Sequence, residues 1–155
     1  MEYMSTDMTW QTHSTSSADT EALGAKIGAN LRGGEVIELV SDLGGGKTTF
    51  TRGLVCGTGS TDKVASPTFT ISKEYQAPHF TIAHFDFYRL GEAGIVADEL
   101  AELAGDPTYV VVVEWGDVAQ DVLPPERTTV TIQLQAEDQR HITVSYSAKF
   151  AYLLQ

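Results

Sequence analysis

The chain has a single cysteine, Cys56, among its 155 residues. One cysteine can form neither an intrachain disulfide nor a cysteine zinc site. Long apolar runs are also missing, and the run from Tyr109 to Val113 is far too short to span a bilayer. The N-terminal residues show no basic region followed by an apolar one, so no secretory signal is readable. These absences predict a cytoplasmic protein in a reducing environment. We expect no association of this protein with a membrane.

Basic residues are scarce as well. Ten lysines and arginines stand against 21 aspartates and glutamates, which gives a formal net charge of −11. Between residues 86 and 126, Arg89 is the one basic residue among ten acidic ones. Such a surface repels a nucleic-acid backbone, so independent nucleic-acid binding is not expected. It fits a basic protein partner, or a solvated acidic face that has no specific partner.

The stretch from Val36 to Leu54, VIELVSDLGGGKTTFTRGL, has the layout of a phosphate-binding P-loop. An apolar strand precedes three glycines, a lysine and two threonines, and a segment with helical spacing follows. The glycines let several backbone N–H groups point into one concavity, and the helix N-terminus adds partial positive charge. Lys47 would supply a charge for the β and γ phosphates, and Thr48 a hydroxyl for Mg²⁺. Ser41 replaces the first glycine of the consensus, which would cost about 1 kcal/mol or more if that position needs a positive φ.

Two carboxylates follow predicted strands. Asp86 comes directly after the apolar strand Phe80 to Phe85, and Glu114 after the strand Tyr109 to Val113. In a parallel sheet the carboxyl ends of the strands face the ligand crevice. Asp86 is therefore placed to hold a magnesium-bound water or to orient the attacking one, and Glu114 to bind Mg²⁺ directly or through water. His84 is interpreted as a buried core histidine.

The segment Ser66 to Thr70, SPTFT, has two interpretations. Pro67 pushes Ser66 towards an extended conformation, which fixes the approach of the chain. Thr68, just after this corner, could then reach the γ phosphate or its magnesium, as switch loops do. The alternative is a turn that leads into a strand from Phe69 to Tyr75. The sequence leaves both open.

The remaining patterns predict a sheet flanked by helices. Polar and apolar residues alternate weakly from Thr9 to Thr15, which could be an edge strand. Ser16 carries the start signal of a helix, and Gly33 and Gly34 end it. The serines at the start of this helix are either scaffold or neighbours of a bound base. Residues 91 to 105 should form one or two short helices. The C-terminal part alternates as a hairpin, with strands around Ile132 and Val144.

The expected fold class is α/β, a single-domain P-loop NTPase. Its sheet should be mixed and mostly parallel, with an antiparallel C-terminal hairpin. We expect a P-loop ATPase domain over residues 9–147, a flexible N-terminus over residues 1–8 and a C-terminal tail over residues 148–155.

The motifs SDLGGGKTTF, SPTFT, HFDFYRL and VEW together resemble the TsaE (formerly YjeE) family, small bacterial ATPases of tRNA threonylcarbamoyladenosine biosynthesis. The four motifs occur in the family's order with similar gaps, and the resemblance runs from about Ser16 to Tyr146. The family pattern at the P-loop is close to GDLGAGKTTF, so this chain departs from it at Ser41 and Gly45.

The resemblance implies ATP and Mg²⁺ as cofactors and assigns roles to individual residues. Lys47 and Asp86 would be catalytic, with Asp86 needed for hydrolysis, and Thr48 and Glu114 would bind the metal. Ser66, Pro67 and Thr68 would belong to a switch-like loop. The nucleotide would be bound by Asp42, Leu43, Gly44, Gly45, Gly46, Lys47, Thr48 and Thr49.

The resemblance also implies protein partners, TsaB and TsaD, of which TsaD transfers the threonylcarbamoyl group to the tRNA. The ATPase would reset that complex between turnovers. Two other functions stay open. A small-molecule phosphotransferase would usually carry a lid with clustered arginines, and the arginines that follow the P-loop (Arg52, Arg89, Arg127 and Arg140) are not clustered in the sequence. A nucleotide-binding scaffold without hydrolysis would need fewer carboxylates near its magnesium.

Overall fold

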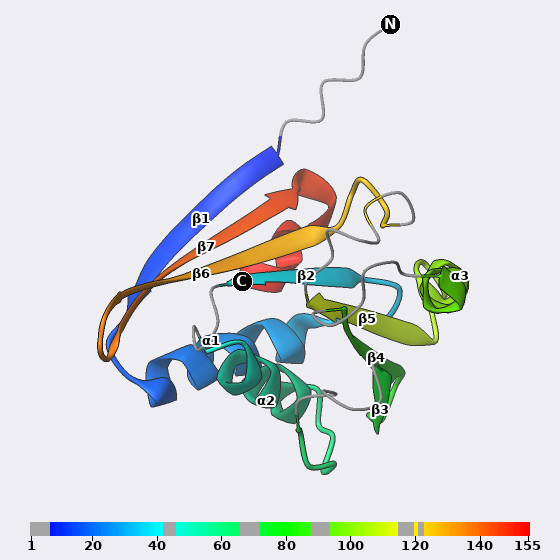
Figure 1. The fold of residues 1–155 in the computed structure, drawn as a ribbon, viewed down its shortest axis with the longest axis horizontal. Helices are drawn as coiled ribbons and strands as arrows, with labels where there is room; N and C mark the ends of the chain where they lie inside the picture. Colours follow the sequence, from blue (N-terminus) through cyan, green and yellow to red (C-terminus); the bar gives the residue numbers. More distant parts are fainter. Residues whose placement is uncertain (1–6, 42–45, 66–71, 88–93, 115–119, 121–122) are drawn as a thin grey trace, which may run out of the picture.

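A seven-stranded sheet forms the centre of the protein in the computed structural model, in the order β1-β7-β6-β2-β5-β4-β3 (Figure 1). The structure describes residues 7–41, 46–65, 72–87, 94–114, 120 and 123–155. The strands are β1 (Asp7–Ser14), β2 (Val36–Ser41), β3 (Ser72–Gln76), β4 (Thr81–Asp86), β5 (Tyr109–Glu114), β6 (Thr128–Ala136) and β7 (Gln139–Ser147). The helices are α1 (Ser17–Asn30), α2 (Lys47–Gly57), α3 (Gly94–Leu103) and the 3-10 helix η2 (Ala148–Leu154).

The sheet is mixed. β6, β2, β5 and β4 are parallel neighbours, whereas β7 pairs antiparallel with both β6 and β1, and β3 pairs antiparallel with β4. β1 therefore runs in the direction of the four parallel strands, and of the seven described strands β7 and β3 run the other way. This arrangement confirms the predicted fold class, including the antiparallel C-terminal hairpin of β6 and β7.

The strand β5 is buried on both faces of the sheet. Side chains from Val110 to Val113 are all 0% exposed, as the unbroken run of β-branched residues predicts for a central parallel strand. Val110 and Val112 belong to the core under α1 and α2, and Val111 and Val113 to the core under α3. Because successive side chains alternate between faces, Glu114 lies on the same face as Val110 and Val112, towards α2.

The helices α1 and α2 lie side by side (Figure 1) and touch through glycines. Gly24 and Gly28 of α1 and Gly53 and Gly57 of α2 each face the backbone of the other helix. A Cβ on Gly53, for example, would lie 2.0 Å from the carbonyl oxygen of Glu21. The absence of side chains at these positions lets the helices approach closely, which fixes α2 and therefore Lys47 at its first turn.

The ends of α1 follow the predicted signals. Ser16 is the N-cap, and its side chain accepts a hydrogen bond from the backbone N–H of Asp19 at 3.1 Å. After the helix, Gly33 and Gly34 both take a positive φ in the turn towards β2. The sequence did not predict η2, which packs on α1 through the buried Leu153; Asn30 donates a hydrogen bond to the Leu153 carbonyl at 3.1 Å. Among the described residues, no helix is long and apolar enough to cross a membrane.

Candidate functional site

The glycine-rich segment connects β2 to α2, as the sequence predicts for a P-loop. Residues 42–45 (Asp42, Leu43, Gly44 and Gly45) lie outside the described part of the chain. Gly46 is the N-cap of α2 and has a left-handed backbone with φ of 106°. Its carbonyl accepts a hydrogen bond from the Phe50 N–H at 2.9 Å, which closes the first turn. Glycine is needed at this position because a side chain would be strained there.

Ser41 does not carry that strain. It is the last residue of β2 and pairs in register with Ile132 of β6, so its backbone is extended. Any residue adopts this conformation readily. The replacement of the consensus glycine by serine therefore has no backbone cost in this strand.

The first turn of α2 presents Lys47, Thr48 and Thr49. The N–H groups of a first helical turn have no partners within the helix, which makes them donors for an anion. Thr48 and Thr49 are half-buried, and the Lys47 side chain is 10% exposed. The Thr51 hydroxyl donates to the Lys47 carbonyl at 2.8 Å and fixes the backbone one turn further on.

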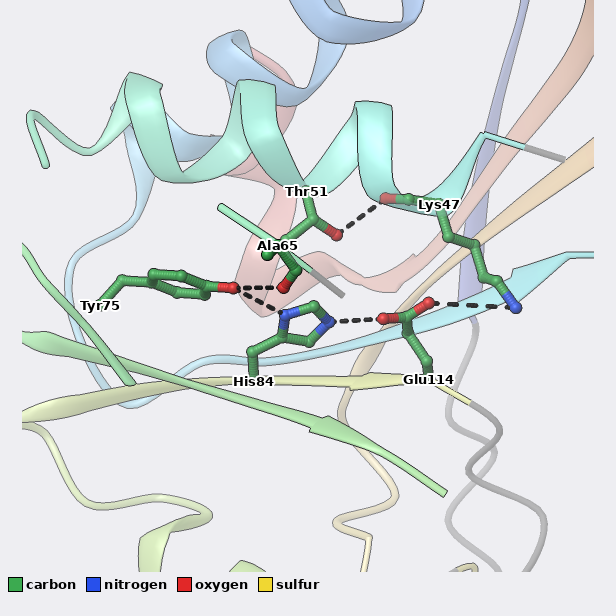
Figure 2. A network of polar contacts seen from close by, with 6 residues as sticks. All are labelled: Lys47, Thr51, Ala65, Tyr75, His84 and Glu114. Carbon is green, nitrogen blue, oxygen red and sulfur yellow. Dashed lines mark hydrogen bonds and ion pairs between the residues drawn. The ribbon is translucent and has the colours of Figure 1, made fainter. Parts of the chain in front are cut away.

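Lys47 faces Glu114 across the sheet end (Figure 2). The Lys47 Nζ lies 3.9 Å from Oε1 of Glu114, and the Glu114 side chain is only 4% exposed. A buried carboxylate without partners would cost several kcal/mol. The two side chains predicted to bind phosphate and metal thus meet in one place, although they are 67 positions apart in the sequence (114 − 47).

Asp86 lies next to Glu114 because β4 and β5 end together. The two residues are register partners in the parallel pair, and the pairing continues with a hydrogen bond from the Phe87 N–H to the Glu114 carbonyl at 3.1 Å. Paired positions place their Cβ atoms on the same face of the sheet. Because of this register, the predicted catalytic carboxylate and the predicted metal ligand are neighbours on the face that carries α2. The Asp86 side chain is half-buried there.

His84 is buried, as predicted, but it is also part of the site. Its side chain is 1% exposed, and its Nε2 lies 2.5 Å from Oε2 of Glu114 (Figure 2). Its other ring nitrogen, Nδ1, lies 3.4 Å from the hydroxyl of Tyr75, which donates to the Ala65 carbonyl at 2.9 Å. Sequence reasoning missed the contacts of His84 and Tyr75 because both depend on the register of three strands.

The environment of Tyr75 changes its acidity. Burial raises the pKa of the Tyr75 phenol, and the nearby charge of Glu114 adds to that effect. Tyr75 therefore stays protonated at neutral pH and remains a hydrogen-bond donor.

The side chains at this sheet end fit a hard cation in their chemistry. The Thr48 hydroxyl and the carboxylates of Asp86 and Glu114 are oxygen donors of the kind that Mg²⁺ prefers, and this cation usually keeps several waters. Within the described residues, no group of three or more His, Cys, Asp or Glu side chains is arranged to hold a metal ion by itself. The donor set therefore suits a cation that is also bound by the phosphates of a nucleotide.

The predicted switch-like loop falls outside the described residues. This applies to Ser66, Pro67 and Thr68; the described chain stops at Ala65 and resumes at Ser72, the first residue of β3.

A small polar pocket opens beside the first turn of α2. Gly46 and Thr49 line it from the P-loop side, and Ser16, Ser17 and Thr20 from the start of α1. Asp138, from the turn between β6 and β7, and Arg140, from the start of β7, complete the lining. The serines that the sequence left open as scaffold or base neighbours thus border the predicted phosphate-binding segment, next to a carboxylate and a guanidinium.

Two of the arginines outside the P-loop have different places in the fold. Arg127 donates from Nε to the buried carboxylate of Glu38 at 2.9 Å, and Glu38 also accepts from Gln120 at 2.9 Å. Glu38 belongs to the face of β2 that is opposite to Leu39 and α2. Arg127 is therefore a structural residue on the far face, whereas Arg140 borders the pocket beside Gly46.

Several known proteins are similar in sequence to this chain. The sequence model of the family described as "Threonylcarbamoyl adenosine biosynthesis protein TsaE" matches residues 14–142. The tRNA threonylcarbamoyladenosine biosynthesis protein TsaE of Bacillus subtilis is 39% identical over 129 residues, which cover 81% of this chain and 78% of the relative. The protein of the same name from Treponema pallidum is 36% identical over 132 residues, covering 85% of this chain and 97% of the relative.

A solved structure shares the fold. The crystal structure of Bacillus subtilis YdiB matches with a TM-score of 0.75 and 33% sequence identity, over 99% of this chain and 94% of that one. The family match covers most of the chain and includes the P-loop, Asp86 and Glu114. The chain therefore belongs to the TsaE family, whose members take part in the biosynthesis of threonylcarbamoyladenosine in tRNA.

Proposed function

We propose that this protein binds ATP with Mg²⁺ at the junction of β2 and α2, and hydrolyses it. The observation that carries this proposal is the meeting of Lys47 and Glu114 at 3.9 Å, with Asp86 as the register partner of Glu114. A lysine, a hydroxyl at a helix N-terminus and two carboxylates at strand ends are the groups that phosphoryl transfer to water requires.

Each side chain has a task in this reaction. Lys47 binds the β and γ phosphates, together with the N–H groups of the first turn of α2. Thr48 and Glu114 hold the metal, which neutralises the charge of the phosphates when it is bound. Asp86 lies beside Glu114 and orients the attacking water. The small pocket between the starts of α1 and α2, near Ser16 and Arg140, lies on the side where we expect the nucleoside of the ligand.

The biological role follows from the family. In our proposal the ATPase acts on a TsaB–TsaD complex in the cytoplasm and resets it between turnovers of tRNA modification. The net charge of −11 fits protein partners better than direct binding to tRNA. Hydrolysis is expected to depend on these partners.

The test is ATP turnover, measured with the protein alone and then with TsaB and TsaD. Magnesium-dependent release of phosphate that rises with the partners supports the proposal, and its absence under both conditions contradicts it. Transfer of the γ phosphate to a small-molecule acceptor instead of water would favour a phosphotransferase. Arg127 gives no support to that alternative because Glu38 holds it on the far face of the sheet.

A further inference from the structure

The two carboxylate oxygens of Glu114 have different partners. Oε2 lies 2.5 Å from Nε2 of His84, whereas Oε1 faces Nζ of Lys47 at 3.9 Å (Figure 2). An ionised carboxylate can only accept hydrogen bonds, so the ring nitrogen of His84 is the donor. One oxygen is thus held inside the protein, and the other is turned towards the P-loop.

His84 itself is held in place from its other side. Its Nδ1 lies 3.4 Å from the Tyr75 hydroxyl, and the two rings pack with centroids 6.0 Å apart. The Tyr75 hydroxyl is anchored to the Ala65 carbonyl at 2.9 Å, and Tyr75 is 1% exposed. A buried imidazole with contacts at both nitrogens cannot rotate without losing one of them.

The strand register gives His84 its position relative to both carboxylates. His84 pairs with Val112, and Asp86 pairs with Glu114, so the contact between His84 and Glu114 is diagonal across the two strands. Carboxylates directly opposite each other repel. A donor that binds Oε2 of Glu114 therefore fixes this carboxylate against the repulsion of Asp86.

We propose that His84 is a positioning residue for Glu114, and that Tyr75 fixes the orientation of the His84 imidazole. This inference rests on the proposed function, in which Glu114 binds Mg²⁺. Because His84 occupies Oε2, Oε1 is the oxygen that Glu114 offers to the cation. The contact with His84 would keep Oε1 in place when the phosphates of the nucleotide draw Lys47 away from the carboxylate.

The test measures nucleotide binding and avoids turnover. The affinity for a non-hydrolysable ATP analogue is determined by calorimetry in excess chelator and then at increasing Mg²⁺, for wild type, His84→Leu, His84→Gln and Tyr75→Phe. Ile82→Val is the matched control, because Ile82 is a fully buried residue of the same strand and face. Removal of a group that orients a metal ligand typically weakens metal affinity by about 10- to 100-fold.

We expect His84→Leu to raise the half-saturating Mg²⁺ concentration by about tenfold or more. The affinity in chelator should stay close to that of wild type. His84→Gln keeps an N–H donor and should restore much of the loss, Tyr75→Phe should have an intermediate effect, and Ile82→Val none. A Mg²⁺ dependence of His84→Leu that equals that of Ile82→Val would overturn the inference while leaving the proposed function intact. A wild type without any Mg²⁺ dependence would overturn both.

If His84→Leu does not fold, a double-mutant cycle decides. Glu114→Gln is measured in the wild-type and the Tyr75→Phe backgrounds, because Tyr75→Phe is expected to weaken the support of Glu114 through His84. A smaller loss of Mg²⁺ dependence in the second background shows that Tyr75 and Glu114 act together and supports the inference. Equal losses show that Tyr75 and Glu114 act independently and overturn it.

Discussion

Gly28 of α1 lies so close to Leu54 of α2 that a Cβ on Gly28 would be 2.0 Å from the Leu54 carbonyl oxygen. Gly24 makes a similar contact with the Phe50 carbonyl, at 2.3 Å. No rotamer change can relieve such contacts because both partners are backbone. The position of α2, and with it the placement of Lys47, depends on the absence of side chains from this face of α1.

Gly28→Ala should therefore destabilise the protein. Overpacking against a backbone forces the helices apart and costs about 2 kcal/mol of unfolding free energy or more. The sign is informative, because alanine in place of glycine at an exposed helical position would stabilise by about 1 kcal/mol. The reverse change at the exposed neighbour, Ala29→Gly, is the control and should cost about 1 kcal/mol. Urea unfolding measures all three proteins, and a Gly28→Ala variant more stable than wild type would disprove the close packing.

The sequence predicted the local parts of the fold well. The P-loop pattern, the serine cap of α1, the valine run of β5 and the alternation of β6 and β7 each arise within one short segment. Backbone conformation and burial at this range follow from neighbouring residues, so the elements and the positions of Lys47, Asp86 and Glu114 at element ends were accessible.

The long-range relationships were not accessible from one sequence. The contact of His84 with Glu114 depends on the register of β4 on β5, and that of His84 with Tyr75 on the register of β3 on β4. A shift of one residue would turn every side chain to the opposite face, and no local pattern states the register of a parallel pair. The strand order and the partners of Glu38 were hidden for the same reason.

Lys47→Ala should weaken ATP binding by at least about tenfold, which corresponds to the loss of a single charge-assisted hydrogen bond of about 1.5 kcal/mol or more. The fold should remain intact, because Glu114 keeps its hydrogen bond with His84. Calorimetry with ATP measures the change, and Lys63→Ala, which removes an exposed lysine, is the control. Unchanged affinity in Lys47→Ala would end the P-loop interpretation.

Thr48→Ala and Glu114→Ala should each raise the Mg²⁺ concentration needed for half-maximal ATPase activity. Each would remove one proposed oxygen ligand from a cation that requires near-octahedral coordination. Affinity for ATP in the presence of chelator serves as the internal control and should change less than the Mg²⁺ requirement. If neither variant alters that requirement, the metal assignment is wrong.

Tyr152→Phe should reduce stability through Glu35. The Tyr152 hydroxyl donates to Oε2 of Glu35 at 2.6 Å, and Glu35 also accepts from the backbone of Arg32 and Gly33. Loss of one such hydrogen bond costs about 1 kcal/mol. Burial, followed by the contact with Glu35, raises the pKa of Tyr152 above its ordinary value of 10.0. The stabilisation is therefore complete below about pH 10 and declines as pH rises further. Melting temperatures of wild type and variant should converge above that pH, and a constant difference would contradict the role of the phenol proton.

Asp86→Asn should separate ATP binding from hydrolysis. The change preserves the size of the side chain but removes the charge that we propose orients the attacking water, and the proposed phosphate-binding groups around Lys47 are untouched. Loss of one such group commonly reduces the rate by about 100-fold or more, whereas ATP affinity should stay within about tenfold because the charge lies beside Glu114 and outside the P-loop. Single-turnover hydrolysis with TsaB and TsaD present measures the rate, and calorimetry measures the affinity. Asp98→Asn on the exposed side of α3 is the control.

The Asp86→Asn variant should still join the partner complex with ATP and stall it after few turnovers. A wild-type rate would remove Asp86 from catalysis, and a parallel loss of ATP binding would make it a binding or structural residue.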